Sequence, residues 1–195
     1  MKTLSTLLAI AFLGTLPAHA AIQMIGDTPA IACAKAAADQ QSGANISTPS
    51  QRGALALCNK ALADKLLPKD RTATLVNRGI IQAAAGNSQA ALADYNDALA
   101  RAPELASAYL NRGAVLMQVG RFQDARSDFD RALALNTDRP AIAYFNRGMA
   151  NEKLGALPAA YRDYKQAQTL APDFKPAGVE LARFQVSGHQ YAANR

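Results

Sequence analysis

The sequence has 195 residues, of which 50% are hydrophobic and 18% charged, and its formal net charge is +6. Basic and acidic side chains are interspersed without a run of like charge, which indicates a solvated surface and argues against a nucleic-acid-binding protein. This length is sufficient for one domain with a buried core.

The first 20 residues predict a cleaved signal peptide. Lys2 gives a positive start, residues 4–16 form an apolar run, and Ala18-His19-Ala20 is a small-x-small cleavage site. We expect cleavage after Ala20 and a periplasmic or secreted product. The alternative is a retained membrane anchor, which is disfavoured because the apolar run is shorter than the ~20 residues that span a bilayer.

Residues 21–71 contain both cysteines, Cys33 and Cys58. An even number of cysteines in an exported chain predicts a disulfide. A redox-active pair is the alternative, but such a pair usually has the spacing Cys-x-x-Cys. The segment is interpreted as a degenerate helical hairpin stapled by Cys33–Cys58, with a first helix at 29–41. The second helix is expected to carry Ala54, Cys58 and Ala61.

Residues 72–174 contain a repeated pattern. Asn-Arg-Gly occurs at 77–79, 111–113 and 146–148, at steps of 34 and 35 residues. An active site is built once, whereas self-similarity at a period of about 20–50 residues is typical of solenoids. The triplet therefore predicts three copies of one structural unit.

In the middle copy we expect two helices, at 106–119 and 122–135. Tyr109, Gly113 and Leu116 follow an i, i+4, i+7 spacing and share one face of the first helix. Small residues opposite large ones let the two helices approach closely. On the second helix the matching residues are Ala125, Phe129 and Ala132; the outer copies have Leu75, Gly79, Ala91, Tyr95 and Ala98, and Tyr144, Gly148, Ala160, Tyr164 and Ala167.

Prolines end the second helices of the outer copies, at Pro103 and Pro172. The middle copy has Thr137 at this place, one extra residue, and a delayed Pro140. The three copies are therefore assigned to residues 72–105, 106–140 and 141–174.

At these residues the chain resembles the tetratricopeptide repeat family. The shared pattern is an aromatic residue or Leu, a Gly, an Ala, an aromatic, another Ala and a terminal Pro, with period 34. The resemblance implies an all-α fold, a right-handed α–α solenoid of helix hairpins whose first helices line a concave surface. It also implies that this surface holds a peptide or helix of a partner protein.

Residues 175–195 are expected to form a C-terminal cap and a tail. A helix at 176–186 presents Val179, Leu181 and Phe184, which can cover the last repeat. Terminal units of a solenoid need such a cap because their outer edge is apolar. The last residues, 187–195, should fray.

The arginine of each triplet is expected to pair with an aspartate. Arg112 and Asp128 both lie eight residues from Gly120, at the expected turn, so they stand level on antiparallel helices. We expect a structural role for these pairs; ligand binding is the alternative. The predicted ion pairs are Arg78 with Asp94, Arg112 with Asp128, and Arg147 with Asp163.

The asparagine of each triplet points away from the partner helix of its own hairpin. In the family this direction is the concave groove, so the resemblance suggests an asparagine ladder that clamps a peptide backbone. The alternative is that these amides only solvate an exposed face or bond neighbouring helices. The expected groove residues are Asn77, Asn111, Asn146, Val76, Ile80, Leu110, Ala114, Met117, Gln118, Phe145, Met149 and Lys153.

These residues predict a non-enzymatic protein–protein interaction module, an adaptor or scaffold for a peptide or helix of an envelope protein. The alternative is a self-associating envelope protein whose groove is filled by its own C-terminal helix or by a second copy. We expect no enzyme activity, cofactor, metal or nucleic acid. After cleavage only His189 remains among the histidines, and no nucleophile–base pair or phosphate loop is present in the sequence.

Overall fold

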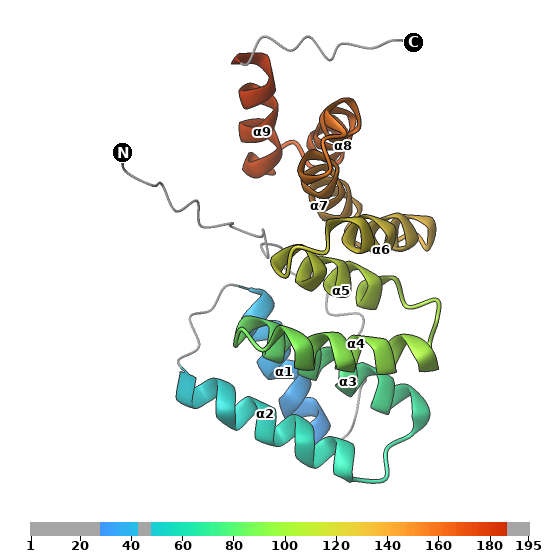
Figure 1. Cartoon of the computed structure of the whole chain (residues 1–195). Helices are drawn as coiled ribbons and strands as arrows, with labels where there is room; N and C mark the ends of the chain where they lie inside the picture. The colour runs from blue at the N-terminus through green and yellow to red at the C-terminus, as the bar shows by residue number, and fades with distance from the viewer. Residues whose placement is uncertain (1–27, 43–47, 187–195) are drawn as a thin grey trace.

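A computed structural model describes residues 28–42 and 48–186 of the chain. This described part is all α-helical and has no strand (Figure 1). The expected signal peptide and the expected frayed tail lie outside it. The helices are α1 (Pro29–Gln41), α2 (Thr48–Ala63), α3 (Pro68–Ala84), α4 (Ser88–Arg101), α5 (Ala106–Gln118), α6 (Phe122–Ala134), α7 (Pro140–Lys153), α8 (Leu157–Leu170) and α9 (Lys175–Val186).

Helices α3 to α8 form three antiparallel hairpins, each with a glycine in its turn. Gly86, Gly120 and Gly155 have φ of 80°, 77° and 76°, a left-handed conformation that a side-chain-bearing residue adopts only at a cost of roughly 1–2 kcal/mol. The residue after each glycine closes the turn; Arg121 N–H donates to the Leu116 carbonyl oxygen at 2.9 Å. The three turns thus have the same geometry.

The middle hairpin ends differently from the other two. Asn136 has φ of 54°, and the Thr137 N–H donates to the Ala132 carbonyl oxygen at 3.1 Å. Asparagine tolerates this left-handed conformation better than most residues. The extra residue of the middle repeat is therefore accommodated in a helix-ending turn, after which Pro140 begins α7.

The observed helix bounds differ slightly from the expected ones. The helices of the middle repeat end at Gln118 and Ala134, each one residue earlier than expected. Helix α3 begins at Pro68, four residues before the expected first repeat. Proline at the first position of a helix has a suitable fixed φ, so Pro68 favours this earlier start.

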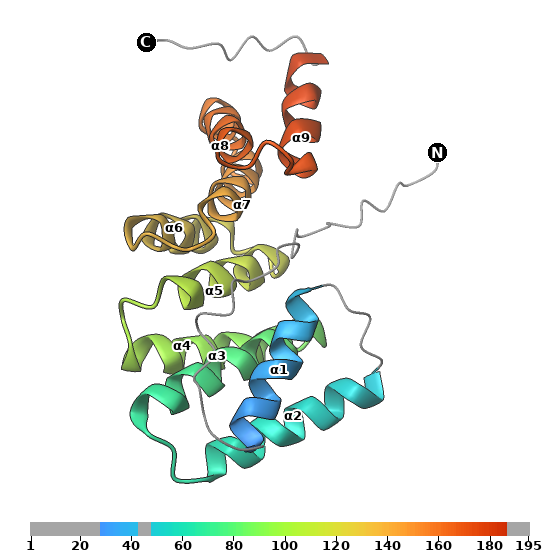
Figure 2. The same ribbon diagram turned by 180° about the vertical axis from the view of Figure 1, so that it is seen from behind.

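The N-terminal hairpin is held by the disulfide Cys33–Cys58, which confirms the expected pairing. Both cysteines are fully buried. Helix α1 packs against α3 as well as α2, so that α3 lies between α4 and α1 (Figures 1 and 2). Val76 and Ile80 of α3 share one apolar cluster with the disulfide. The first repeat is therefore covered by α1 on the side away from α4.

Helix α9 lies against α8 at the other end of the stack. Leu181 and Phe184 pack in one apolar cluster with Tyr164 of α8. The Phe184 ring lies 5.9 Å from the Tyr164 ring, nearly edge-on. Helix α9 thus covers the outer edge of the last hairpin. Its Val179 side chain stays exposed to solvent.

Removing the disulfide is expected to destabilise the N-terminal hairpin. A double Cys33→Ser/Cys58→Ser variant no longer constrains a sequence separation of 25 residues, which in the chain-entropy model stabilises by about 3–4 kcal/mol. Denaturant unfolding should show a lower midpoint for this variant than for the wild type. Dithiothreitol should lower the wild-type midpoint and leave that of the variant unchanged. Equal midpoints for the oxidised wild type and the variant would contradict this expectation.

Candidate functional site

The asparagines of the three repeats lie at equivalent positions on the first helices α3, α5 and α7. Asn111 is 7% exposed, Asn146 is 4% exposed, and Asn77 is half-buried. None of the three amides hydrogen bonds to another described residue. The only fully enclosed and unpartnered side-chain polar atom in the described residues is Nε2 of Gln40. These amides are therefore largely buried, unpaired, and still in contact with solvent.

The expected apolar walls of the groove require a correction, because most of them are buried in the core. The residue directly before each of the three asparagines points about 100° away from that asparagine around the helix, toward the next repeat. Leu110 and Met117 accordingly pack in a cluster that includes Ala143 and Ala150 of α7. Four of these buried residues are Val76, Leu110, Met117 and Phe145.

The remaining residues of the expected groove differ in exposure. Ile80 and Ala114 are buried, Met149 is half-buried, and Gln118 and Lys153 are exposed. Ile80 is covered because it packs in the cluster that also contains α1 residues. The surface that stays open is thus smaller and more polar than expected.

Two half-buried residues that were not among the expected groove residues complete this surface. Ser107 precedes Asn111 by four residues, and Ile142 precedes Asn146 by the same spacing. Residues four apart lie on one helix face. We use the term inner face for the stripe on α5 and α7 that is formed by Ser107, Asn111, Ala114, Gln118, Ile142, Asn146, Met149 and Lys153.

The end of α1 is tied to the start of α7. The Arg139 guanidinium donates from Nη2 to Oε1 of Gln41 at 2.9 Å, across 98 residues of sequence. Gln41 is buried. Burial lowers the pKa of Arg139, and the charge of Asp138 opposes this effect. The sequence pattern contains no signal for this contact, which links the N-terminal hairpin to the residue that directly precedes α7.

The expected arginine–aspartate pairs are present in all three hairpins, with two hydrogen bonds in each. Arg112 donates from Nε and Nη2 to the two carboxylate oxygens of Asp128, at 2.8 and 2.7 Å. Arg112 also lies over the Tyr109 ring, 5.4 Å from its centroid. The other two pairs have the same bidentate geometry: Arg78 with Asp94 and Arg147 with Asp163.

The third guanidinium nitrogen of each arginine reaches the preceding repeat. Arg112 Nη1 donates to Oδ1 of Asn96 on α4 at 2.8 Å. Arg147 Nη1 does the same to Asp130 on α6 at 2.7 Å, and Arg78 Nη1 to Asn59 on α2 at 2.8 Å. Each arginine therefore connects two hairpins as well as the two helices of its own hairpin. The accepting residue directly follows Tyr95, Phe129 or Cys58 in the sequence, and this shared position was a signal that we missed.

The described residues contain no group of three metal-ligating side chains. In the same residues, no helix is long and apolar enough to span a membrane. The inner face instead carries asparagine amides, which donate and accept hydrogen bonds as a peptide backbone does. The arginine–aspartate ion pairs lie elsewhere on the hairpins. Such an inner face is suited to holding a peptide.

Comparison with protein families matches two tetratricopeptide repeat models, one to residues 104–173 and one to residues 76–126. Together these matches cover residues 76–173, from within α3 to beyond the end of α8. The chain belongs to the tetratricopeptide repeat family. No curated protein matches this tetratricopeptide repeat chain significantly.

Solved structures show the same fold. The first tetratricopeptide repeat domain of Spaghetti (RPAP3), bound to the HSP90 peptide SRMEEVD, is 27% identical, with a TM-score of 0.57 over 60% of this chain and 91% of that chain. The Arabidopsis OM64 domain is 26% identical, with a TM-score of 0.57 over 60% and 95%. MamA from Desulfovibrio magneticus RS-1 is 20% identical, with a TM-score of 0.66 over 86% and 89%; at this identity the likeness concerns the fold alone.

Proposed function

We propose that this chain is a non-enzymatic interaction module that holds a peptide segment of another cell-envelope protein on its inner face. The observation that carries the proposal is the pair of largely buried amides of Asn111 and Asn146, which have no hydrogen-bond partner among the described residues. Both amides keep some contact with water, so a hydrogen bond from each of them to a ligand replaces one to water and contributes about 0.5–1.5 kcal/mol.

The chemistry of the inner face indicates what the segment carries. An asparagine side chain both donates and accepts hydrogen bonds, as a peptide backbone does. Ile142 and Met149 add half-buried apolar contacts on α7, and methionine adapts to ligands of different shape. The segment that fits best is extended or helical, with apolar side chains between its backbone contacts.

Helix α1 limits where this segment binds. It covers α3, so the first repeat offers less free surface than the second and third. The segment therefore lies mainly against α5 and α7. The solved complex of the similar Spaghetti domain with an HSP90 peptide supports the proposal that this chain binds a peptide.

The envelope location belongs to the same proposal. The N-terminal pattern of Lys2, the apolar run and Ala18-His19-Ala20 supports export. The Cys33–Cys58 disulfide supports it as well, because disulfides persist in oxidising compartments. Fractionation of cells that express the full chain tests this part: the protein should appear in the periplasm or medium with its N-terminus at Ala21.

An Asn77→Ala/Asn111→Ala/Asn146→Ala variant is expected to lose the partner while keeping its fold. Each lost hydrogen bond contributes about 0.5–1.5 kcal/mol, so affinity should fall at least about tenfold. Quantitative pull-down from envelope extract identifies the partner, and anisotropy with a labelled peptide of that partner then measures the affinity. A thermal melt checks the fold of the variant.

The matched control changes three exposed glutamines on the second helices, Gln89→Ala/Gln123→Ala/Gln166→Ala. This control should bind the peptide like the wild type. Equal affinity of the asparagine variant and the wild type would rule out the inner face as the binding site. Recovery of this chain alone, with sedimentation that depends on concentration, would instead show self-association.

A further inference from the structure

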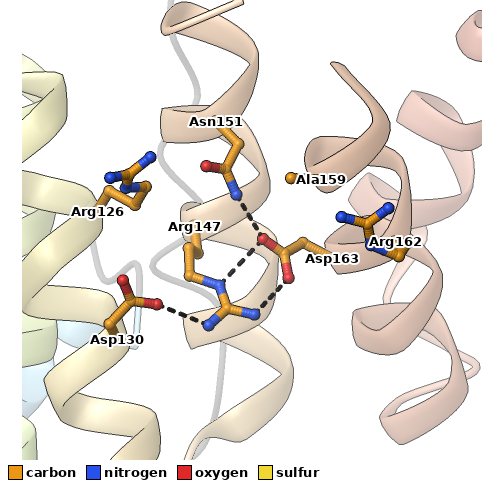
Figure 3. A pocket seen from close by; sticks show the side chains of 7 residues that line it. All are labelled: Arg126, Asp130, Arg147, Asn151, Ala159, Arg162 and Asp163. Atoms are coloured by element: carbon orange, nitrogen blue, oxygen red, sulfur yellow. Dashed lines mark hydrogen bonds and ion pairs between the residues drawn. The ribbon is translucent and has the colours of Figure 1, made fainter. Parts of the chain in front are cut away.

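A pocket of about 250 Å³ lies between α6, α7 and α8 (Figure 3). Arg147 donates from Nη2 to Oδ1 of Asp163 at 2.6 Å and from Nη1 to Oδ1 of Asp130 at 2.7 Å. Asn151 donates from Nδ2 to Oδ2 of Asp163 at 2.8 Å. Arg147 and Asn151 lie on a different side of α7 from Asn146. The pocket is therefore separate from the inner face.

Two further arginines line opposite walls of this pocket, Arg126 on α6 and Arg162 on α8 (Figure 3). Neither has an ion pair or a hydrogen bond with another described residue. Arg147, in contrast, uses its Nε and both Nη atoms. Both lining aspartates are bonded to Arg147, so Arg126 and Arg162 have no direct carboxylate partner, and the lining as a whole carries one excess positive charge.

The equivalent junction one repeat earlier, between α4, α5 and α6, lacks these features. There Arg112 makes the same hydrogen bonds as Arg147, but uncharged residues stand at the places of Arg126 and Arg162, and Asn96 stands at the place of Asp130. The repeat pattern therefore does not account for Arg126 and Arg162. The matched positions in the earlier and later junction are Leu92 and Arg126, Leu116 and Asn151, and Ser127 and Arg162.

We propose that this pocket binds a small oxyanion, a carboxylate or a phosphate, between Arg126 and Arg162. The fork of a guanidinium matches both kinds of oxyanion with two parallel hydrogen bonds. The three arginines and two aspartates of the pocket leave one positive charge, which one monoanion neutralises. A water occupies roughly 30 Å³, so the pocket also accommodates several waters beside the ion.

The test uses inorganic phosphate in one titration and acetate in another, at constant ionic strength set with sodium chloride. Side-chain Nε–Hε signals of the arginines are followed by NMR in the full mature chain. At least one anion should give saturating shifts at Arg126 and Arg162. Saturation with phosphate alone identifies a phosphate site, and saturation with acetate alone a carboxylate site. Linear shifts without saturation for both anions would overturn the proposal.

Residues from the equivalent junction provide the variants. Arg126→Leu/Arg162→Ser should weaken binding at least about tenfold, because each lost charge-assisted hydrogen bond contributes about 1.5–3 kcal/mol. Should this double variant fail to fold, Arg162→Ser alone carries the test, since Arg162 is exposed. The control is Arg131→Ser, an exposed arginine on α6 outside the pocket. Undiminished binding in the pocket variants, or equal losses in the control, would refute the site.

Discussion

Replacing Gly113 with alanine is expected to lower the free energy of unfolding by about 1–3 kcal/mol. A Cβ at this position would lie 2.6 Å from Cε1 and 3.0 Å from Cζ of Phe129. Phe129 is fully buried, so its ring cannot move aside without disturbing the hairpin. Overpacking therefore outweighs the roughly 1 kcal/mol that alanine gains over glycine in a helix. Chemical denaturation with a two-state fit measures the change.

Gly53 of α2 provides the matched control. It also lies within a helix, but a Cβ built there has no neighbour within 4 Å. Gly53→Ala should therefore stabilise the protein by about 0.5–1 kcal/mol. If the two variants change the free energy of unfolding in opposite directions, Gly113 is required for the close approach of the two helices. A general need for a flexible backbone would not explain that result. A Gly113→Ala/Phe129→Leu variant should recover part of the loss; stabilisation by Gly113→Ala alone would contradict the crossing geometry.

Asp128→Ala is expected to destabilise the protein by about 3–5 kcal/mol. The Asp128 side chain is 7% exposed and that of Arg112 is 23% exposed. Removing the carboxylate leaves the guanidinium largely out of water, with Asn96 as its remaining hydrogen-bond acceptor. The same denaturation measurement applies. Because Arg112 keeps some contact with water, the lower end of this range is expected.

An exposed pair on α4 serves as the comparison. Arg101 and Asp97 are 3.9 Å apart, and their side chains are 41% and 55% exposed. Asp97→Ala should change stability by less than about 1 kcal/mol, as surface ion pairs usually do. In a double-mutant cycle, Arg112→Ala and Asp128→Ala should together cost less than the sum of their separate effects. Purely additive losses would mean that the two residues do not act as a pair.

The hairpins and their ion pairs could be predicted because both depend on local spacing. Arg112 and Asp128 stand level since they are equidistant from Gly120, and Gly113 and Phe129, which directly follow them in the sequence, meet beside this pair. Antiparallel helices joined by a short turn allow few other arrangements. The family resemblance then supplied the order in which the hairpins stack.

The exposure of the groove could not be predicted in the same way. Leu110 and Met117 lie on one edge of α5, and whether this edge is open depends on the angle at which α7 packs. A helical periodicity gives directions around one helix and contains no information on that angle. The position of α1 was equally hidden, because its alanine-rich sequence has no repeat signature, while its packing on α3 depends on tertiary contacts around Cys33.

The hydrogen bond between Gln41 and Arg139 affects how far the stack of hairpins can bend. Solenoid proteins are flexible along their axis, because each repeat contacts only its neighbours. Here the Gln41–Arg139 hydrogen bond joins the end of α1 to the start of α7, across 98 residues of sequence, and it opposes such bending. A preorganised receptor loses less entropy when it associates. For the peptide binding proposed above, this hydrogen bond should therefore reduce the entropy that is lost on association.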